Sequence, residues 1–169
     1  MELLDIIKAR RSVRNYTGAR VANEHIDKIL EAGRWAPSGL NNQPWRFAVV
    51  KKEETKREIA NATKYSSVVL GADVLVAVFL DRSVMYDRTK DVQAIGACIQ
   101  NMLLEAHSLG LGACWLGQIL ANRDKVEKLL SASPNLELMA VIAIGHPTSA
   151  SQTSRRKGLD ELVFLWEEA

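Results

Sequence analysis

The sequence contains only two cysteines, Cys98 and Cys114, in 169 residues. A single cysteine pair does not make the disulfide framework of a small secreted domain. No leader-like segment, with a cationic start, an apolar stretch and small residues, precedes Glu2. We therefore expect a reducing, cytoplasmic location.

The sequence also has no long apolar run and no excess of one charge. A membrane-spanning helix needs about 18 to 20 consecutive apolar residues, and the stretch 68–80 is interrupted by Gly71 and Asp73. The net charge is +2, from 22 basic and 20 acidic residues, which is not the charge balance of a nucleic-acid-binding domain. We expect neither a membrane nor a nucleic acid as partner.

Two kinds of binding motif are absent. His25, His107 and His146 do not form a His-x-x-x-His pair, and the cysteines do not form Cys-x-x-Cys, so the sequence predicts no local metal site. Neither a Gly-x-Gly-x-x-Gly motif nor a P-loop occurs. Any nicotinamide nucleotide would therefore bind transiently rather than in a Rossmann domain.

The composition, 47% hydrophobic and 25% charged, is that of one globular domain over residues 1–169. Asn23 is the expected cap of a helix, and the long helix 92–109 carries small residues that suit close approach within the core or across a dimer. The order of elements predicts an α+β fold with a central sheet of about four strands packed with helices. Apolar spacing places the helices at 2–10, 23–35, 53–62, 92–109 and 122–131 and the strands at 46–51, 74–80, 136–144 and shortly after Gly110.

Residues 36–47, Ala-Pro-Ser-Gly-Leu-Asn-Asn-Gln-Pro-Trp-Arg-Phe, differ from an ordinary turn. Pro37 ends the preceding helix and Gly39 relaxes the backbone, so that a flat ring could lie close to the main chain. The polar side chains that follow offer donors and acceptors suited to the edge of a planar heterocycle. The alternative is a polar turn whose amides cap nearby backbone groups, and for Asn42 alone we favour that alternative.

Basic residues cluster near both ends of the chain. Arg10, Arg11 and Arg14 follow the first helix, and residues 155–157 are Arg-Arg-Lys. Taken alone, each cluster also suits a solvated surface, where ion pairs contribute about 0 to 1 kcal/mol each.

Taken together, these motifs resemble the nitroreductase family of flavin oxidoreductases. Residues 37–45 are similar to its Pro-Ser-x-x-Asn-x-Gln-Pro-Trp signature, and residues 10–14 are similar to its Arg-Arg-Ser-x-Arg motif. The similarity continues through 110–117 to the tail at 155–159, where Gly158 stands in place of the more usual proline. It covers nearly the whole chain.

The resemblance implies a homodimer that binds FMN, takes hydride from NADH or NADPH and reduces a nitroaromatic, a quinone or a similar small electron acceptor in a ping-pong cycle. It implies flavin sites shared between subunits, the long helix at the dimer interface and the tail 148–169 docked on the partner. The flavin carries out the chemistry, so no catalytic side chain is expected. The implied cofactor-binding residues are Arg10, Arg11, Ser12, Arg14, Pro37, Ser38, Gly39, Asn41, Gln43, Leu116, Gly117, Arg155 and Arg156.

Roles within this set follow from the same resemblance. Arg10 is expected at the phosphate, joined from the tail by Arg156, or by Arg155 if the register slips by one. Ser12 and Arg14 are expected at the ring edge near N1 and O2, where a cation favours the reduced anion. The backbone N–H groups of residues 116–117 are expected to point toward N5.

Three other residues are given no site role. We reject Cys114 as a nucleophile, because no neighbouring histidine or lysine is visible to lower its pKa. Trp45 and Trp115 are expected in the core.

Two other hypotheses remain open. One keeps the flavin and changes the reaction to reductive dehalogenation or to breakdown of the flavin itself. The other is a non-catalytic module in which the basic clusters hold an anionic ligand, a nucleotide or nucleic acid. Residues 81–91 form a shorter loop than in many relatives, which implies a more open pocket.

Overall fold

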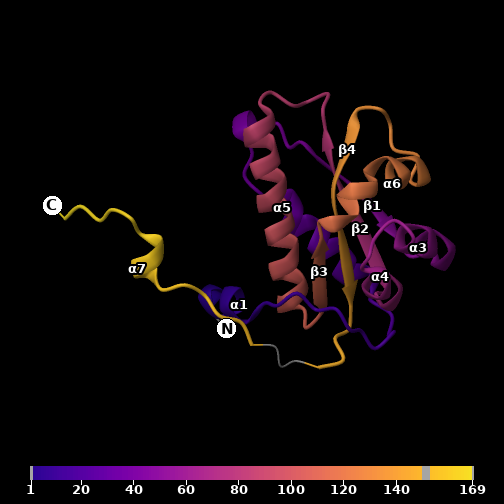
Figure 1. Cartoon of the computed structure of the whole chain (residues 1–169), viewed down its shortest axis with the longest axis horizontal. Helices are drawn as coiled ribbons and strands as arrows, with labels where there is room; N and C mark the ends of the chain where they lie inside the picture. Colours follow the sequence, from indigo (N-terminus) through magenta and orange to yellow (C-terminus); the bar gives the residue numbers. More distant parts are fainter. Residues whose placement is uncertain (1, 150–152, 169) are drawn as a thin grey trace.

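The computed structural model describes residues 2–149 and 153–168. An antiparallel sheet of four strands, in the order β1-β2-β4-β3, is covered by helices on both faces (Figure 1). This confirms the predicted α+β fold and the predicted sheet. The strands are β1 (Trp45–Val50), β2 (Val74–Asp81), β3 (Gly112–Leu116) and β4 (Leu136–Gly145).

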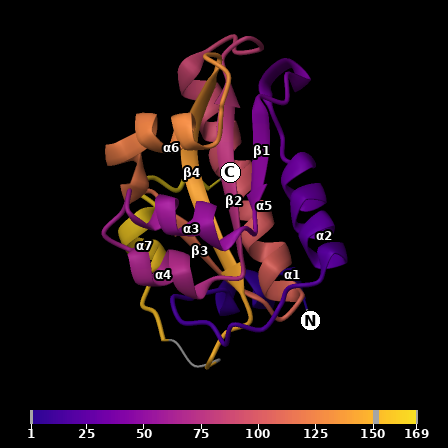
Figure 2. The same cartoon turned by 90° about the vertical axis from the view of Figure 1, so that its right-hand side faces the viewer.

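Both faces of the central strand β2 are buried. Because side chains alternate along a strand, Val74, Val76, Val78 and Leu80 pack on one side and Leu75, Ala77 and Phe79 on the other. The first side lies under α2 (Asn23–Arg34) and α5 (Arg88–Ser108), and the second under α3 (Glu53–Ala60), α4 (Ser66–Gly71) and α6 (Arg123–Leu129) (Figure 2). Residues 74–80 form a near-continuous apolar run because side chains on both faces of β2 are covered by helices.

The long helix α5 begins four residues earlier than predicted, at Arg88. The Asp87 side chain accepts a hydrogen bond from the Lys90 N–H and caps the helix. Ala94 is buried in the core, whereas a Cβ atom on Gly96 would meet no atom within 4 Å. The small residues of α5 therefore have two roles: Ala94 packs in the core, and Gly96 leaves open space at the surface of the helix.

Three local predictions were wrong. Helix α4 was not predicted, because its six residues are too few for the apolar period to show. Asn23 is the first residue of α2 rather than its cap, and its side chain accepts a hydrogen bond from Lys51 Nζ at 3.1 Å. Trp45 is buried as expected, but Trp115 is 41% exposed, because β3 is an edge strand.

The two ends of the chain meet at one end of the sheet. After α1 (Leu3–Ala9), Ser12 forms a parallel bridge with Ala113, and the Val13 N–H donates to the Ala113 carbonyl at 3.0 Å. Beyond β4 the tail runs past α1 and includes α7 (Leu159–Leu162) (Figure 1). Residues 150–152 and 169 of the predicted tail lie outside the described residues. No helix in the described part of the chain is long and apolar enough to cross a membrane.

The tail carries apolar side chains that its own chain does not cover. Phe164 is 99% exposed and Trp166 77% exposed. Figure 1 shows α7 standing away from the helices and the sheet. A run of exposed large apolar residues is typical of a surface that binds another chain.

Candidate functional site

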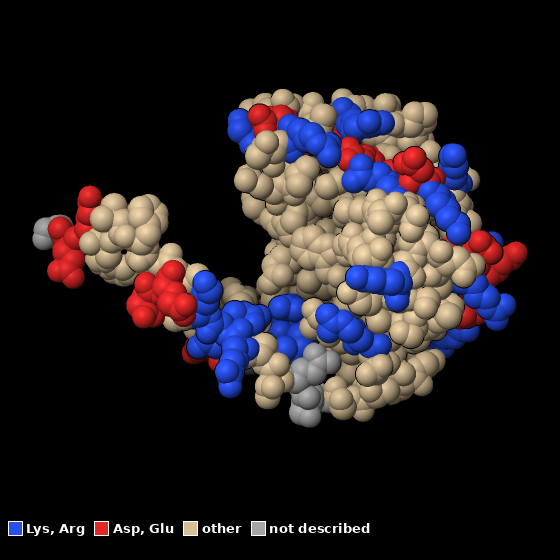
Figure 3. Space-filling view, viewed as in Figure 1, with Lys and Arg blue, Asp and Glu red and all other residues tan. Residues whose placement is uncertain are grey.

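Arginines from both ends of the chain converge beside α1. Arg10 follows the last residue of α1 and is half-buried, and Arg156 approaches it from the tail. Burial first, and then the charges of Arg156 and Arg11, hold the pKa of Arg10 below its ordinary value. Figure 3 shows lysine and arginine side chains gathered where α1 and the tail meet. We call Arg10, Arg11 and Arg156 the arginine seat.

Arg10 also carries an unsatisfied polar atom. Its Nε is buried and has no hydrogen-bond partner within the described chain. A buried donor without a partner is costly unless a bound group completes it. An anion such as a phosphate would both satisfy this donor and reduce the repulsion between the arginines.

The tail places its two arginines differently. Arg156 lies close enough to Arg10 for their charges to interact, and its Nη1 donates to the Arg155 carbonyl at 2.8 Å. Arg155 contributes that backbone carbonyl. Of the two tail arginines, Arg156 is the one whose charge acts on Arg10.

Ser12 and Arg14 lie along the edge of β3. Val13 packs so closely on Gly112 that a Cβ atom there would come within 2.6 Å of Val13 Cγ1. Gly112 therefore permits this docking, and Arg14 Nη1 donates to the Ser12 carbonyl at 3.2 Å. Burial raises the pKa of the Cys114 thiol, and the nearby charge of Arg14 offsets this only in part. That direction supports the rejection of Cys114 as a nucleophile.

Strand β3 leads directly to the next two site residues. Leu116 is buried at its end, and Gly117 follows with ordinary helical backbone angles. A Cβ atom on Gly117 would meet nothing within 4 Å. The main chain at this point is therefore open to a close neighbour.

The turn 37–43 has an unusual backbone. It contains the short 3-10 helix η1 (Gly39–Asn41), and Leu40, Asn41 and Gln43 have positive φ values of 54°, 54° and 46°. Residues other than glycine rarely adopt this region, and such strain concentrates at functional sites. The Ser38 hydroxyl accepts a hydrogen bond from the Gln43 N–H, and the Gln43 amide donates to the Asn41 carbonyl.

Asn41 differs from its neighbours in the turn. Within the described residues its exposed side-chain amide has no hydrogen-bond partner, whereas Asn42 donates to Asp91 Oδ1 at 2.7 Å and to the Val84 carbonyl. Asn42 thus has the structural role that we favoured for it. Asp91, which binds Asn42, was not among the predicted site residues; its position as a carboxylate in the first turn of the long apolar helix was the sign that could have indicated it.

Gly39 has a different neighbour from the one expected. A Cβ atom on Gly39 would lie 1.8 Å from the Tyr86 hydroxyl. The missing side chain at Gly39 therefore makes room for the Tyr86 hydroxyl. Pro37, Ser38, Gly39 and Tyr86 line one hollow of about 300 Å³ with Lys90, Gln93, Ala94 and Ala97 of α5.

The two halves of the predicted site lie at opposite ends of α5. The turn adjoins residues 90–97, whereas the charges of Arg10 and Arg11 act on His107 in the last turn. At 1.5 Å per residue, Lys90 and His107 are roughly 25 Å apart along the helix. The structure places Arg10 and Arg156 beside α1, Ser12 at the start of β3 and Gly117 just after its end, whereas residues 37–43 lie beside the first turns of α5.

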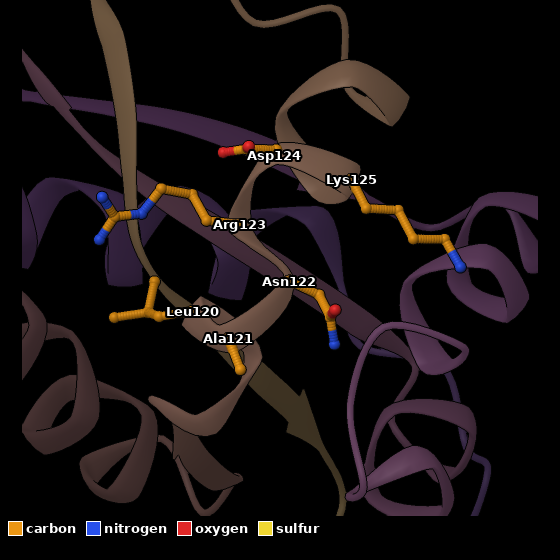
Figure 4. Close-up of a pocket in the computed structure, with 6 residues that line it drawn as sticks. All are labelled: Leu120, Ala121, Asn122, Arg123, Asp124 and Lys125. Carbon is orange, nitrogen blue, oxygen red and sulfur yellow. The ribbon is translucent and has the colours of Figure 1, made fainter.

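A larger cavity, of about 550 Å³, lies elsewhere (Figure 4). It is lined by residues 120–125, at the end of the 3-10 helix η2 (Gln118–Asn122) and the start of α6. Asn122 donates to the Ala62 carbonyl and Arg123 to Glu137, so two of its polar side chains are already engaged. Its polar groups hold the fold together, and we assign no cofactor to it. No cluster of three or more His, Cys, Asp or Glu that could bind a metal occurs among residues 2–149 and 153–168.

Comparison with known proteins decides the family. The family model described as "Nitroreductase family" matches residues 7–66 and 60–146, most of the chain. The chain belongs to the nitroreductase family. The resemblance seen in the sequence motifs is therefore confirmed.

Similar nitroreductases cover most of the chain. A protein of Methanothermobacter thermautotrophicus, named as a candidate NADH dehydrogenase/NAD(P)H nitroreductase, is 39% identical over 150 residues, which cover 87% of this chain and 78% of that protein. A crystal structure of a candidate nitroreductase from Desulfovibrio desulfuricans in complex with FMN is 45% identical. It has a TM-score of 0.93 and covers 100% of this chain and 99% of its own.

A more distant structure supports the fold alone. The NADPH:FMN oxidoreductase of Vibrio harveyi, complexed with NAD+, is 22% identical with a TM-score of 0.88. The match covers 99% of this chain and 79% of that one. The nitroreductase fold thus persists where little sequence identity remains.

Proposed function

We propose that this nitroreductase is a homodimeric, FMN-dependent oxidoreductase that takes hydride from NADH or NADPH and passes it to a nitroaromatic, a quinone or a similar small acceptor. The observation that carries the proposal is the arginine seat, where cations from both ends of the chain face one another and the buried Arg10 Nε lacks a partner in the described chain. The names of the relatives, an NAD(P)H nitroreductase and an FMN complex, agree with it.

The described residues fit FMN. Arg10 and Arg156 offer cations to a phosphate, Asn41 offers a free amide to the ring edge, and the open main chain at Gly117 admits a flat ring. When bound, FMN supplies the redox chemistry by accepting a hydride and returning it to an acceptor. Reduction of a nitro group to a nitroso group consumes one hydride and one proton and releases water.

The side chains would orient the flavin ring and adjust its redox properties, and they would not react themselves. Arg14 and Ser12 hold the ring edge, where the Arg14 charge stabilises negative charge on the reduced ring. Leu116 and Gly117 would offer their backbone N–H groups to N5 of a bound flavin. In the proposed dimer the partner subunit would close the site and exclude water.

Separation of the two motifs supports a shared site. One ring held by Ser12 and Arg14 meets residues 37–43 only if a second copy supplies that turn. The open space beside Gly96 of α5 and the exposed apolar tail at Phe164 and Trp166 offer the contact area. We propose that α5 lies at the dimer interface and that the tail, within residues 148–169, docks on the partner.

Gly117→Val is expected to abolish retention of FMN without unfolding the subunit. The added methyl groups enter a space that the chain leaves open, and the backbone angles there suit any residue. FMN content after gel filtration and thermal unfolding of the flavin-free protein measure the two effects. Ala121→Val, four residues on at an exposed position, serves as control. Full FMN content in Gly117→Val contradicts the placement of the ring.

Colour and electron transfer test the function directly. We expect purified protein to be yellow, to bleach on anaerobic addition of NADH or NADPH and to regain colour with a nitroaromatic or a quinone. A colourless protein that refuses FMN and binds oligonucleotides in a salt-sensitive manner would support the non-catalytic module instead. A screen of acceptors, including halogenated phenols, separates nitro reduction from dehalogenation.

A further inference from the structure

We infer that the hollow beside the amide turn is a subsite for an aromatic electron acceptor that carries a carboxylate, and that Lys90 selects for that charge. The inference rests on the proposed function, because the turn must approach the partner's flavin for the hollow to adjoin the reacting ring. It adds the chemical class of the acceptor and the residue that recognises it.

The hollow has the size and lining for one substituted ring. Its volume of about 300 Å³ lies at the lower end of the range for small-molecule sites. Pro37, Ala94, Ala97 and the ring of Tyr86 give apolar walls. An aromatic ring placed here stacks against these walls.

Lys90 supplies the only lysine or arginine charge in the lining. Its Nζ lies over the Tyr86 ring, 5.2 Å from the centroid, and no carboxylate among the described residues forms a salt bridge with it. Its stem therefore rests on an aromatic face while the ammonium group keeps hydrogen-bond donors for a ligand. A carboxylate is a suitable partner for a cation that has no anion of its own.

A buried carboxylate makes the hollow a rigid site. Asp91 is fully buried, and its Oδ2 accepts hydrogen bonds from the N–H groups of Tyr86 and Asp87 while its Oδ1 accepts from Asn42. One side chain thus joins the loop that carries Tyr86 to the turn that carries Asn41. Tyr86 is fixed further by its contact with Gly39. Asp91 acts as a positioning residue for both walls.

The helical spacing places four lining residues in one stripe along α5. Gln93, Ala94 and Ala97 follow Lys90 by three, four and seven positions, which is the spacing of one face of an α-helix. Gln93 therefore lies one turn beyond Lys90 and offers an amide to the same ligand. The hollow therefore has a charged group and an amide on one side and apolar walls on the other. Such a lining binds an anionic aromatic acceptor more tightly than a neutral one.

The test compares two acceptors in the oxidative half-reaction. Flavin-loaded protein is reduced with dithionite, and reoxidation by 4-nitrobenzoate and by 4-nitrobenzyl alcohol is followed by stopped-flow absorbance. We expect Lys90→Met to lower the ratio of the two second-order rate constants, benzoate over alcohol, by about tenfold. Lys90→Arg should restore most of the ratio, because it keeps the charge. Lys128→Gln, which removes an exposed lysine of α6, is the control for net charge.

The outcomes separate this inference from the proposed function. An unchanged ratio in Lys90→Met, or an equal loss for both acceptors, overturns the subsite while flavin loading and reduction stay intact. A variant that slows reduction by NADPH or NADH but keeps the acceptor ratio assigns the lysine to the nucleotide phosphate and also overturns it. Wild-type protein that holds no flavin overturns the proposed function and this inference with it.

Discussion

Arg10→Gln is expected to lower the affinity for FMN about 10- to 100-fold, because a hydrogen bond to a charged group contributes about 1.5 to 3 kcal/mol and each 1.4 kcal/mol is tenfold. Glutamine keeps the stem and an amide but removes the cation that meets the phosphate. Titration of flavin-free protein, followed by quenching of FMN fluorescence, measures the change.

Titration with riboflavin shows whether the loss of affinity is specific to the phosphate. It lacks the phosphate, so Arg10→Gln should leave its weaker binding nearly unchanged. Burial and the charges of Arg156 and Arg11 already disfavour the Arg10 cation, so its removal should not lower the thermal stability of the flavin-free protein. Arg57→Gln, at an exposed position of α3, controls for net charge. An equal loss for FMN and riboflavin would show that Arg10 does not hold the phosphate.

The second large effect is recovery of flavin binding in a mixed dimer. Arg10→Gln and Asn41→Asp subunits are each expected to retain little FMN as homodimers. When the two are co-expressed with different tags and purified as the mixed species, one site combines an intact Arg10 from one chain with an intact Asn41 from the other. About one FMN per dimer is then expected, because a two-fold dimer repeats each contact and only one of its two sites is intact.

The mixed dimer distinguishes shared sites from separate ones. If each subunit bound FMN alone, both chains would be defective and the mixed species would stay empty. A double variant, Arg10→Gln with Asn41→Asp in one chain paired with a wild-type chain, is the control. In that pairing, one shared site lacks an intact Arg10 and the other lacks an intact Asn41, so both sites are weakened. Recovery in the control but not in the mixed dimer would refute the shared arrangement.

Much of the fold follows from local sequence. The burial of both faces of β2, the ends of β1 and β4, and helices α1, α2, α3 and α6 agree with the predictions to within a few residues, because a strong apolar pattern survives in the folded state. The start of α5 and the existence of α4 were missed. A capping aspartate four residues upstream and a six-residue helix carry too little periodic pattern to be recognised.

The sequence by itself determined the family and the α+β class, because motifs such as 10–14 and 37–45 are contiguous in the chain. Only the tertiary structure decided which of those motifs meet. It brought Arg156 to Arg10 across the whole chain, separated both from the amide turn by the length of α5, and placed Tyr86 against Gly39. The physical reason is that a rigid helix and the register of a sheet set distances that no local pattern contains.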